Sequence, residues 1–187
     1  MITSTSSSQV KHVVNLQKKA KLRKEEKQFV VEGVKMVSEA PADRLVKVYV
    51  SETFKADNEE FLERMNYDSI GKDVLEIVTD NVFMRMADTQ TPQGIMAVVR
   101  MSDTDLEGIL SDKRNPLLLI IENLQDPGNL GTIVRMAEGA GVTGIIMSSN
   151  TVDIYNPKTI RSTMGSLYRV PVIYVDDICA VSYTHLR

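Results

Sequence analysis

The sequence predicts an α/β protein with a parallel sheet in its C-terminal part. Residues 117–121 (LLLII) form an apolar run without a polar interruption, which is typical of a strand buried on both faces of a parallel sheet. A polar turn follows at 122–128, and a helix with a regular apolar stripe follows the turn. Strands and helices alternate through most of the remaining chain, which also indicates an α/β class.

The helix after this turn is the first candidate for function. We expect Asn129 to cap it, directly after the turn residues Asp126, Pro127 and Gly128. Its sheet-facing stripe is predicted to comprise Leu130, Ile133, Val134 and Ala137. Arg135 falls on the other side of the helix. Open α/β sheets bind ligands at the carboxyl ends of their strands, so this turn is a candidate ligand site.

The other elements are predicted from local pattern and turn chemistry. Strands are expected at 29–31, 45–50, 74–78, 95–99, 144–147 and 170–175. Helices are expected from Gly33 to Ala40, from 59 to about 66 with Asn58 as cap, from 80 to 87, and from 157 to about 165. The polar stretch 101–116 contains a weak short helix. We therefore expect a first domain at 1–102, a linker at 103–115 and a second domain at 116–187.

Composition restricts the class of protein. The 187 residues are 43% apolar and 25% charged with a net charge of −3, as in ordinary soluble proteins, so the whole chain is not an electrostatic nucleic-acid binder. The single cysteine, Cys179, excludes a disulfide framework within this chain, and His12 and His185 lack metal-ligand spacing. We expect no metal site, no membrane span and no secretory signal, and hence the cytoplasm as the location.

A local basic excess stands out against this acidic average. Residues 9–27 carry seven cations, Lys11, Lys18, Lys19, Lys21, Arg23, Lys24 and Lys27, against two glutamates. Val10, Val13, Val14 and Gln17 form a weak helical stripe in the same stretch. Two interpretations stay open: a solvated helix face, or a face that contacts nucleic-acid phosphates.

Several nucleotide and hydrolase motifs are absent. No Gly-Lys-Ser/Thr follows the turn, and Gly128 and Gly131 are spaced G-x-x-G rather than G-x-G-x-x-G. The next predicted strand ends in Ser148 and Ser149, so no carboxylate follows it to bind a ribose hydroxyl. These absences argue against a P-loop or NAD enzyme, and no histidine is placed for a Ser/His/Asp hydrolase.

One long motif is specific. Residues 123–135 read Asn-x-x-Asp-Pro-Gly-Asn-x-Gly-x-Ile-x-Arg, and a second motif covers 162–166 (STMGS) with Val-Pro-Val at 170–172. They resemble the first two motifs of the SpoU/TrmH family of RNA ribose 2′-O-methyltransferases, in the SPOUT superfamily. The first half is similar to the family's ribosomal-protein-like α/β RNA-binding domain at 2–4, Lys11, 29–33 and 91–94. The second would then be a SPOUT (α/β knot) methyltransferase domain.

The resemblance implies methyl transfer from S-adenosylmethionine to a ribose 2′-hydroxyl of RNA, with rRNA favoured over tRNA, by a homodimer. It implies a catalytic role for Arg135 and Asn129, and cofactor contacts from Gly165 and Ser166. The expected RNA-binding residues are Lys11, Lys18, Lys19, Arg23, Glu32, Gly33, Asn123 and Asp126. An arginine is a poor general base, so we expect Arg135 to grip the neighbouring phosphate and favour the alkoxide.

The chain departs from the family after Asp177. The expected third motif, which carries most cofactor contacts, is not present, and residues 181–187 (VSYTHLR) match nothing expected there. We therefore expect a partial methyltransferase domain, inactive by itself, with apolar faces exposed. Two alternatives stay open: a non-catalytic RNA-binding module that uses the basic face, and a small-molecule nucleotide enzyme.

Overall fold

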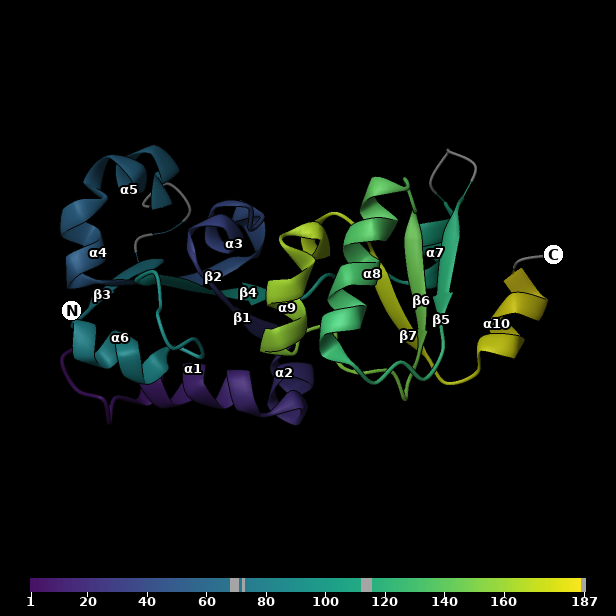
Figure 1. Cartoon of the computed structure of the whole chain (residues 1–187), viewed down its shortest axis with the longest axis horizontal. Coiled ribbons are helices and arrows are strands. Elements are labelled where there is room, and N and C mark those ends of the chain that lie inside the picture. The colour runs from purple at the N-terminus through teal and green to yellow at the C-terminus, as the bar shows by residue number, and fades with distance from the viewer. Residues whose placement is uncertain (68–70, 72, 112–115, 186–187) are drawn as a thin grey trace. The chain divides into compact units, whose positions relative to one another are not determined.

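The computed structural model describes residues 1–67, 71, 73–111 and 116–185 (Figure 1). The chain divides into two compact units, Met1–Met101 and Ser102–Arg187. Each unit has its own sheet, so the two are described separately.

The first unit is built on a four-stranded mixed sheet. Its strands are β1 (Gln28–Glu32), β2 (Leu45–Ser51), β3 (Leu75–Val78) and β4 (Ile95–Arg100), in the order β1-β4-β2-β3. β4 pairs antiparallel with β1 and β2, while β2 and β3 are parallel. The five residues from Ile95 to Val99 are buried, because β4 lies inside the sheet and both faces are covered. The strands predicted at 29–31, 45–50, 74–78 and 95–99 are confirmed, within one residue at most ends.

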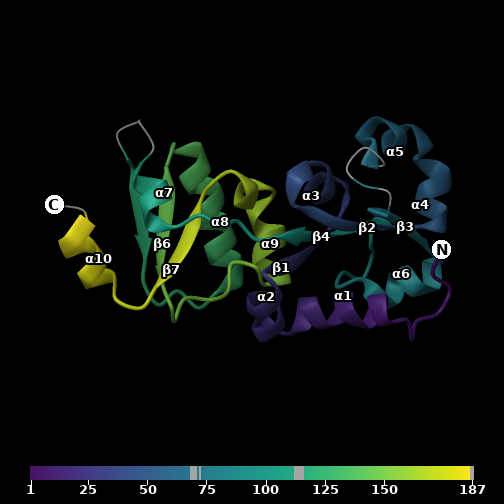
Figure 2. The same cartoon turned by 180° about the vertical axis from the view of Figure 1, so that it is seen from behind.

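Helices cover both faces of this sheet. Figures 1 and 2 show α1 (Ser8–Lys18) and α6 (Asp80–Met86) on one face and α3 (Val34–Ser38) on the other. The core under α1 and α6 includes Leu16, Phe83 and Met96. The remaining helices are α2 (Ala20–Glu26), η1 (Ala42–Arg44), α4 (Glu52–Asp57) and α5 (Glu59–Met65). The sequence did not predict α4, which begins where the Ser51 hydroxyl accepts a hydrogen bond from the Phe54 amide.

The second unit contains the predicted parallel sheet. Strands β5 (Leu118–Ile121), β6 (Gly144–Ser148) and β7 (Val172–Val175) run parallel in the order β5-β6-β7. Helices α8 (Pro127–Gly139) and α9 (Pro157–Thr163) lie side by side on one face (Figure 1). η3 (Ser166–Tyr168) and α10 (Ile178–His185) complete the unit. The parallel arrangement and the helix after the polar turn are confirmed.

One expectation about this sheet is wrong. Residues 117–121 were expected to be buried on both faces, but β5 is an edge strand and only Ile121 is buried in it. Ile120 is 42% exposed. The strand that is buried throughout is β6, because it has a neighbour on each side. An apolar run thus indicates a strand here, but not its position in the sheet.

The polar stretch predicted as a linker contains a folded helix. α7 (Leu106–Leu110) is the expected short helix, and the Asp105 carboxylate caps it by accepting a 2.7 Å hydrogen bond from the Gly108 amide. Ile109 is buried beside Gly144, where a Cβ atom would lie only 2.4 Å from the Ile109 side chain. The absent side chain at Gly144 therefore allows α7 to pack against the start of β6. The extent of the linker itself stays a prediction.

Candidate functional site

Hydrogen bonds join the loops that leave β5 and β6 at the carboxyl edge of the sheet. The Asn123 amide donates to the Ser148 hydroxyl at 2.9 Å, and the Ser148 hydroxyl also pairs with that of Thr151 at 3.0 Å. The Gln125 side-chain amide donates to the Asn150 carbonyl at 2.7 Å. Asn123 has a left-handed backbone conformation (φ 54°), which asparagine tolerates better than most residues. These bonds set where the polar turn ends and α8 begins.

α8 begins earlier than the sequence pattern indicated. Pro127 is its first residue and Asp126 is its cap, with the carboxylate accepting a 2.6 Å hydrogen bond from the Asn129 amide. The expectation that Asn129 is the cap is wrong, because proline fits the first helical position and places the cap one residue before it. The Asp126 side chain therefore stabilises the helix start, and the Asn129 side chain is released from capping. An RNA contact by Asp126 stays a prediction.

Asn129 and Arg135 are both exposed on α8. Six positions of α-helix separate them, which is about 9 Å along the axis and about 120° around it. A long arginine side chain can span part of that distance, so the two residues can contact one extended ligand. The buried side of the helix consists of Leu130, Gly131, Val134 and Ala137, which confirms most of the predicted stripe.

Gly131 fixes how closely α8 approaches α9. A Cβ atom there would lie 2.3 Å from the Ser162 Cβ and 2.7 Å from the Thr159 carbonyl oxygen. No side chain fits in that space, so glycine is required for this packing. The contact fixes the rotation of α8 and thereby the direction in which Arg135 projects.

The two predicted cofactor residues lie at the other end of this layer. Gly165 and Ser166 follow α9 and precede β7, and Ser166 is only 3% exposed. The Arg169 guanidinium next to them pairs with the Glu138 carboxylate near the end of α8, which places η3 at the amino ends of the strands. The structure therefore does not bring Gly165 and Ser166 together with Asn123, Asp126 and Asn129 at the carboxyl edge. Their role in cofactor binding stays a prediction.

The basic stretch of the first unit forms two helices instead of one. Lys19 is in an extended conformation and separates α1 from α2. Lys11, Lys18 and Lys19 are exposed. Arg23 is 3% exposed, and its guanidinium donates hydrogen bonds to the carbonyls of Leu16 and Gln17 at the end of α1. The expected phosphate contact by Arg23 does not fit this burial, because the side chain instead stabilises the junction of the two helices.

Glu32 and Gly33 are held by a loop about sixty residues away. The Glu32 carboxylate accepts hydrogen bonds from the Asp88 amide and the Thr89 hydroxyl. The Gln93 side-chain oxygen accepts a 2.8 Å hydrogen bond from the Val34 amide at the start of α3. Gly33 has φ +98°, and a Cβ there would lie 2.8 Å from this Gln93 oxygen. Two of the matching segments in the first half, 29–33 and 91–94, therefore have structural roles, and the RNA contacts of Glu32 and Gly33 stay predictions.

Ser148 and Gln93 are two residues whose importance the sequence reasoning missed. At Ser148 the sequence analysis noted only that the carboxylate typical of NAD enzymes is absent. Gln93 was noted only as part of a turn. A hydroxyl directly after a buried strand and a glutamine in a proline-glycine turn are weak signals, because both residue types are common in solvated loops.

Two negative findings apply to the described residues. No helix in that part of the chain is long and apolar enough to cross a membrane. Among the same residues, no group of three or more His, Cys, Asp or Glu side chains is arranged to hold a metal ion.

Two domain families match the chain, one in each unit. Residues 7–97 match a family described as the MRM3-like substrate binding domain, and residues 116–183 match the SpoU rRNA Methylase family. The boundary between the two structural units falls between these matches.

Individual proteins that are similar to the chain are also named rRNA methyltransferases. The chain is 32% identical to human rRNA methyltransferase 3, mitochondrial, over 86% of this chain and 38% of that protein. It is 36% identical to Bacillus subtilis RlmP, named 23S rRNA (guanosine(2553)-2′-O)-methyltransferase, over 56% of this chain and 42% of that one. The chain thus spans about two fifths of the length of these curated relatives.

Solved structures share the fold. An AdoMet-bound rRNA methyltransferase from Sinorhizobium meliloti has a TM-score of 0.76 and 25% identity, covering 92% of this chain and 63% of that one. The expected α/β class and the expected relationship are therefore confirmed. The chain thus combines a match to the MRM3-like substrate binding domain at 7–97 with a match to the SpoU rRNA Methylase family at 116–183.

Proposed function

We propose that the protein transfers a methyl group from S-adenosylmethionine to a ribose 2′-hydroxyl of rRNA. The names of the human and Bacillus subtilis relatives support this activity and substrate. The observation that carries the proposal is the arrangement of α8, which exposes Asn129 and Arg135 on a helix whose start is fixed at the carboxyl edge of a parallel sheet. Ligands of open α/β sheets bind at this edge.

The residues at this edge fit a nucleoside-like cofactor by the chemistry of their donors. Asn129 and Asn150 are exposed there and offer neutral amides rather than a cluster of cations, while the Ser149 hydroxyl already donates to the Asp176 carboxylate and the Val175 carbonyl. When bound, S-adenosylmethionine supplies an electrophilic sulfonium methyl group. Gly165 and Ser166 are not part of the cofactor site proposed at this edge, because they lie toward the amino ends of the strands and Ser166 is buried.

Arg135 is proposed to position the substrate. The guanidinium of an arginine is a permanent cation, so it cannot take the proton from the 2′-hydroxyl. It can hold the adjacent phosphate through two parallel hydrogen bonds and stabilise negative charge on the ribose oxygen. Holding the ribose in line with the transferred methyl group is the larger of these effects.

The exposed lysines of α1 and its junction with α2 are proposed to contact RNA phosphates. Lys11, Lys18 and Lys19 supply cations without base specificity, so this part of the affinity falls as salt rises. We also propose that a form of the protein that carries the third motif is a homodimer, and that the protein acts in the cytoplasm. The name of the human relative places that protein in mitochondria.

Methyl transfer to rRNA from tritiated S-adenosylmethionine, measured on a form of the protein completed with the third motif, tests the proposal. Arg135→Ala is expected to lower the rate by about 10²–10³. Arg135→Lys should restore less than about a tenth of the lost rate, because lysine lacks the planar fork. Lys158→Ala, which removes an exposed cation from α9, is the matched control and should retain the wild-type rate.

Two results would contradict the proposal. A fully active Arg135→Lys variant would refute the role given to the guanidinium. Salt-sensitive rRNA binding without any methyl transfer would support a non-catalytic RNA-binding module instead.

A further inference from the structure

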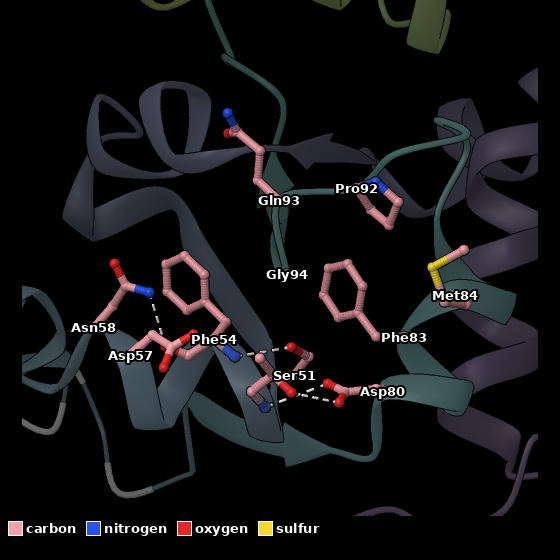
Figure 3. Close-up of a pocket in the computed structure, with 11 residues that line it drawn as sticks. Ser51, Phe54, Asp57, Asn58, Asp80, Phe83, Met84, Pro92, Gln93 and Gly94 are labelled. Atoms are coloured by element: carbon pink, nitrogen blue, oxygen red, sulfur yellow. Dashed lines mark hydrogen bonds between the residues drawn. The ribbon is translucent and has the colours of Figure 1, made fainter.

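A cavity of about 330 Å³ lies in the first unit, between α4, α6 and the turn that precedes β4 (Figure 3). Its size is at the lower end of that of small-ligand pockets. None of the residues proposed above for catalysis, cofactor binding or RNA binding lines it. Its chemistry therefore needs a separate explanation.

Apolar side chains form one part of the cavity wall. Phe54 from α4 and Phe83 from α6 lie on either side of Gly94 (Figure 3). Met84, which is 54% exposed, and Pro92 line the same cavity. Gly94 has φ +84°, and a Cβ there would lie 2.7 Å from the Phe54 Cβ, so the turn approaches the ring closely only with glycine. A flat apolar ligand can pack against this wall.

Two carboxylates form the polar part. Asp80 accepts hydrogen bonds from the Thr53 amide at 3.3 Å and from the Thr53 hydroxyl at 2.5 Å. These bonds lower the pKa of Asp80, which keeps the group ionised at neutral pH. A carboxylate has about four acceptor positions, so Asp80 retains capacity for a further N–H donor. Asp57 lines the cavity as a second carboxylate, and together the two groups disfavour a phosphate inside.

No cation lines the cavity, so its interior is anionic and apolar. Lys55 on α4 lines a second pocket with Glu59, and Arg85 on α6 is exposed outside the lining. Such a lining is complementary to an aromatic ring with amino donors and excludes phosphate, so a nucleotide could enter it only by its base.

We propose that this cavity binds one unpaired RNA nucleobase that carries an exocyclic amino group. The amino group donates to Asp80, with Asp57 as a second acceptor, and the ring packs against Met84, Pro92 and the Phe54 edge. Proteins that read RNA sequence commonly take up unstacked bases in this way, by apolar packing and hydrogen bonds to base edges. The inference rests on the proposed function, because that function makes RNA the occupant.

The carboxylates give the cavity a preference that can be measured. Cytosine and uracil have the same ring size but differ at C4, where cytosine has an amino donor and uracil a carbonyl acceptor. A carboxylate accepts from the amino group and repels the carbonyl, and uracil offers it only the N3–H, which lies between two carbonyl groups. The basic helices contact phosphates alone, so they bind both bases equally. A preference for cytosine over uracil therefore isolates the cavity from the rest of the RNA surface.

The test uses the full chain with ¹³C-labelled methionine methyl groups, titrated with the single-stranded hexamers rC6 and rU6. The Met84 methyl resonance, assigned with Met84→Leu, reports on the cavity. We expect rC6 to bind about tenfold more tightly than rU6, the effect of one hydrogen bond to a charged group, and to shift this resonance. Asp80→Asn keeps the shape of the side chain and should reduce the preference to within about twofold.

Control variants keep the test decisive. Asn81→Ala, one position along α6 and exposed, should retain the preference. If Asp80→Asn unfolds the first unit, the exposed Asp57→Asn decides, and it should reduce the preference. Equal binding of rC6 and rU6 by the wild type, binding without a Met84 shift, or a preference unchanged in the folded Asp80 and Asp57 variants would overturn the inference.

The same samples separate this inference from the proposed function. A chain that methylates rRNA but shows no base preference would contradict the inference alone. A chain that prefers rC6 through the cavity but transfers no methyl group would contradict the proposed activity alone.

Discussion

The two sheets of this protein bury their apolar residues very differently. In the first unit, β4 is antiparallel to both neighbours and helices cover both faces, so every residue from Ile95 to Val99 is buried. In the second unit only β6 is fully buried, and the edge strands β5 and β7 expose Ile120 and Tyr174. A sheet of three parallel strands has two edges and one centre, so equally apolar strands experience different environments. Mutations should therefore have unequal effects in the two sheets.

The largest contrast is expected from two identical substitutions. Ile95→Ala in β4 removes a fully buried side chain and should lower the free energy of unfolding by about 2–5 kcal/mol. Ile120→Ala in β5 should lower it by less than about 1 kcal/mol, because this side chain is 42% exposed. Urea unfolding of both variants measures the difference. Equal losses in the free energy of unfolding would show that Ile120 is covered in solution. The proposed difference in burial between β4 and β5 would then be wrong.

The next contrast lies within α8. Gly131→Ala should destabilise the second unit by about 1–3 kcal/mol, because its Cβ has no space beside Ser162. Gly139→Ala on the same helix meets nothing within 4 Å and should stabilise it by about 0.5–1 kcal/mol through helix propensity. Thermal unfolding of the two variants should shift in opposite directions. A neutral Gly131→Ala would mean that α8 and α9 pack less closely than described.

A smaller effect is expected at the start of α8. Asp126→Ala removes the acceptor for the Asn129 amide and should cost about 1 kcal/mol, whereas Asp126→Asn retains an acceptor and should cost less. Asn129→Ala serves as the control and should leave stability nearly unchanged, because only its backbone takes part in the cap. Denaturant unfolding ranks the three. A loss at Asn129 that exceeds the loss at Asp126 would restore Asn129 as the capping residue.

The smallest effect at neutral pH concerns Tyr49 in the first unit. Burial, with a contribution from Glu76, raises the pKa of Tyr49 to about 12. In the unfolded chain the phenol ionises near pH 10, so stability falls as the pH rises from about 10 toward 12. Tyr49→Phe should flatten this alkaline decrease. It should change stability at neutral pH by only about 0.5 kcal/mol, because the hydrogen bond to Gln9 is 3.1 Å long and partly buried. Phenolate absorbance during a pH titration gives the pKa directly, and a value near 10 would contradict the burial.

The sequence predicted the elements better than their boundaries and surroundings. The run at 95–99 and the motif at 123–135 carry strong local signals, and the structure has a strand and a polar turn before a helix there. The cap of α8 was misplaced because Asn129 was weighed by residue type alone, although Pro127 marks the first helical position. α4 was missed because its cap, Ser51, is also the last residue of β2, so no turn separates the helix from the strand. The break at Lys19 has no glycine or proline to announce it.

The candidate site was predictable only in part, for a related reason. Arg135 and Asn129 could be placed on one helix from the motif, but the burial of Arg23 and Ser166 depends on tertiary packing. From the sequence, Arg23 is expected to be a surface cation because it lies in a basic stretch. Only the structure shows that its guanidinium donates to the carbonyls of Leu16 and Gln17. The cavity beside Asp80 is lined by three separate segments, 51–58, 80–84 and 92–94. No pattern within one segment of the sequence could therefore predict it.

The hydrogen bond between Gln93 and the Val34 amide joins two turns that lie 59 residues apart in the chain. Such a contact closes a long loop, and the pairing of β1 with β4, in which Glu32 lies opposite Met96, holds the two turns close together. The hydrogen-exchange rate of the Val34 amide therefore reports on this contact. Exchange of this proton with solvent deuterium would measure how often the turn before β4 separates from the start of α3 while β1 and β4 remain paired.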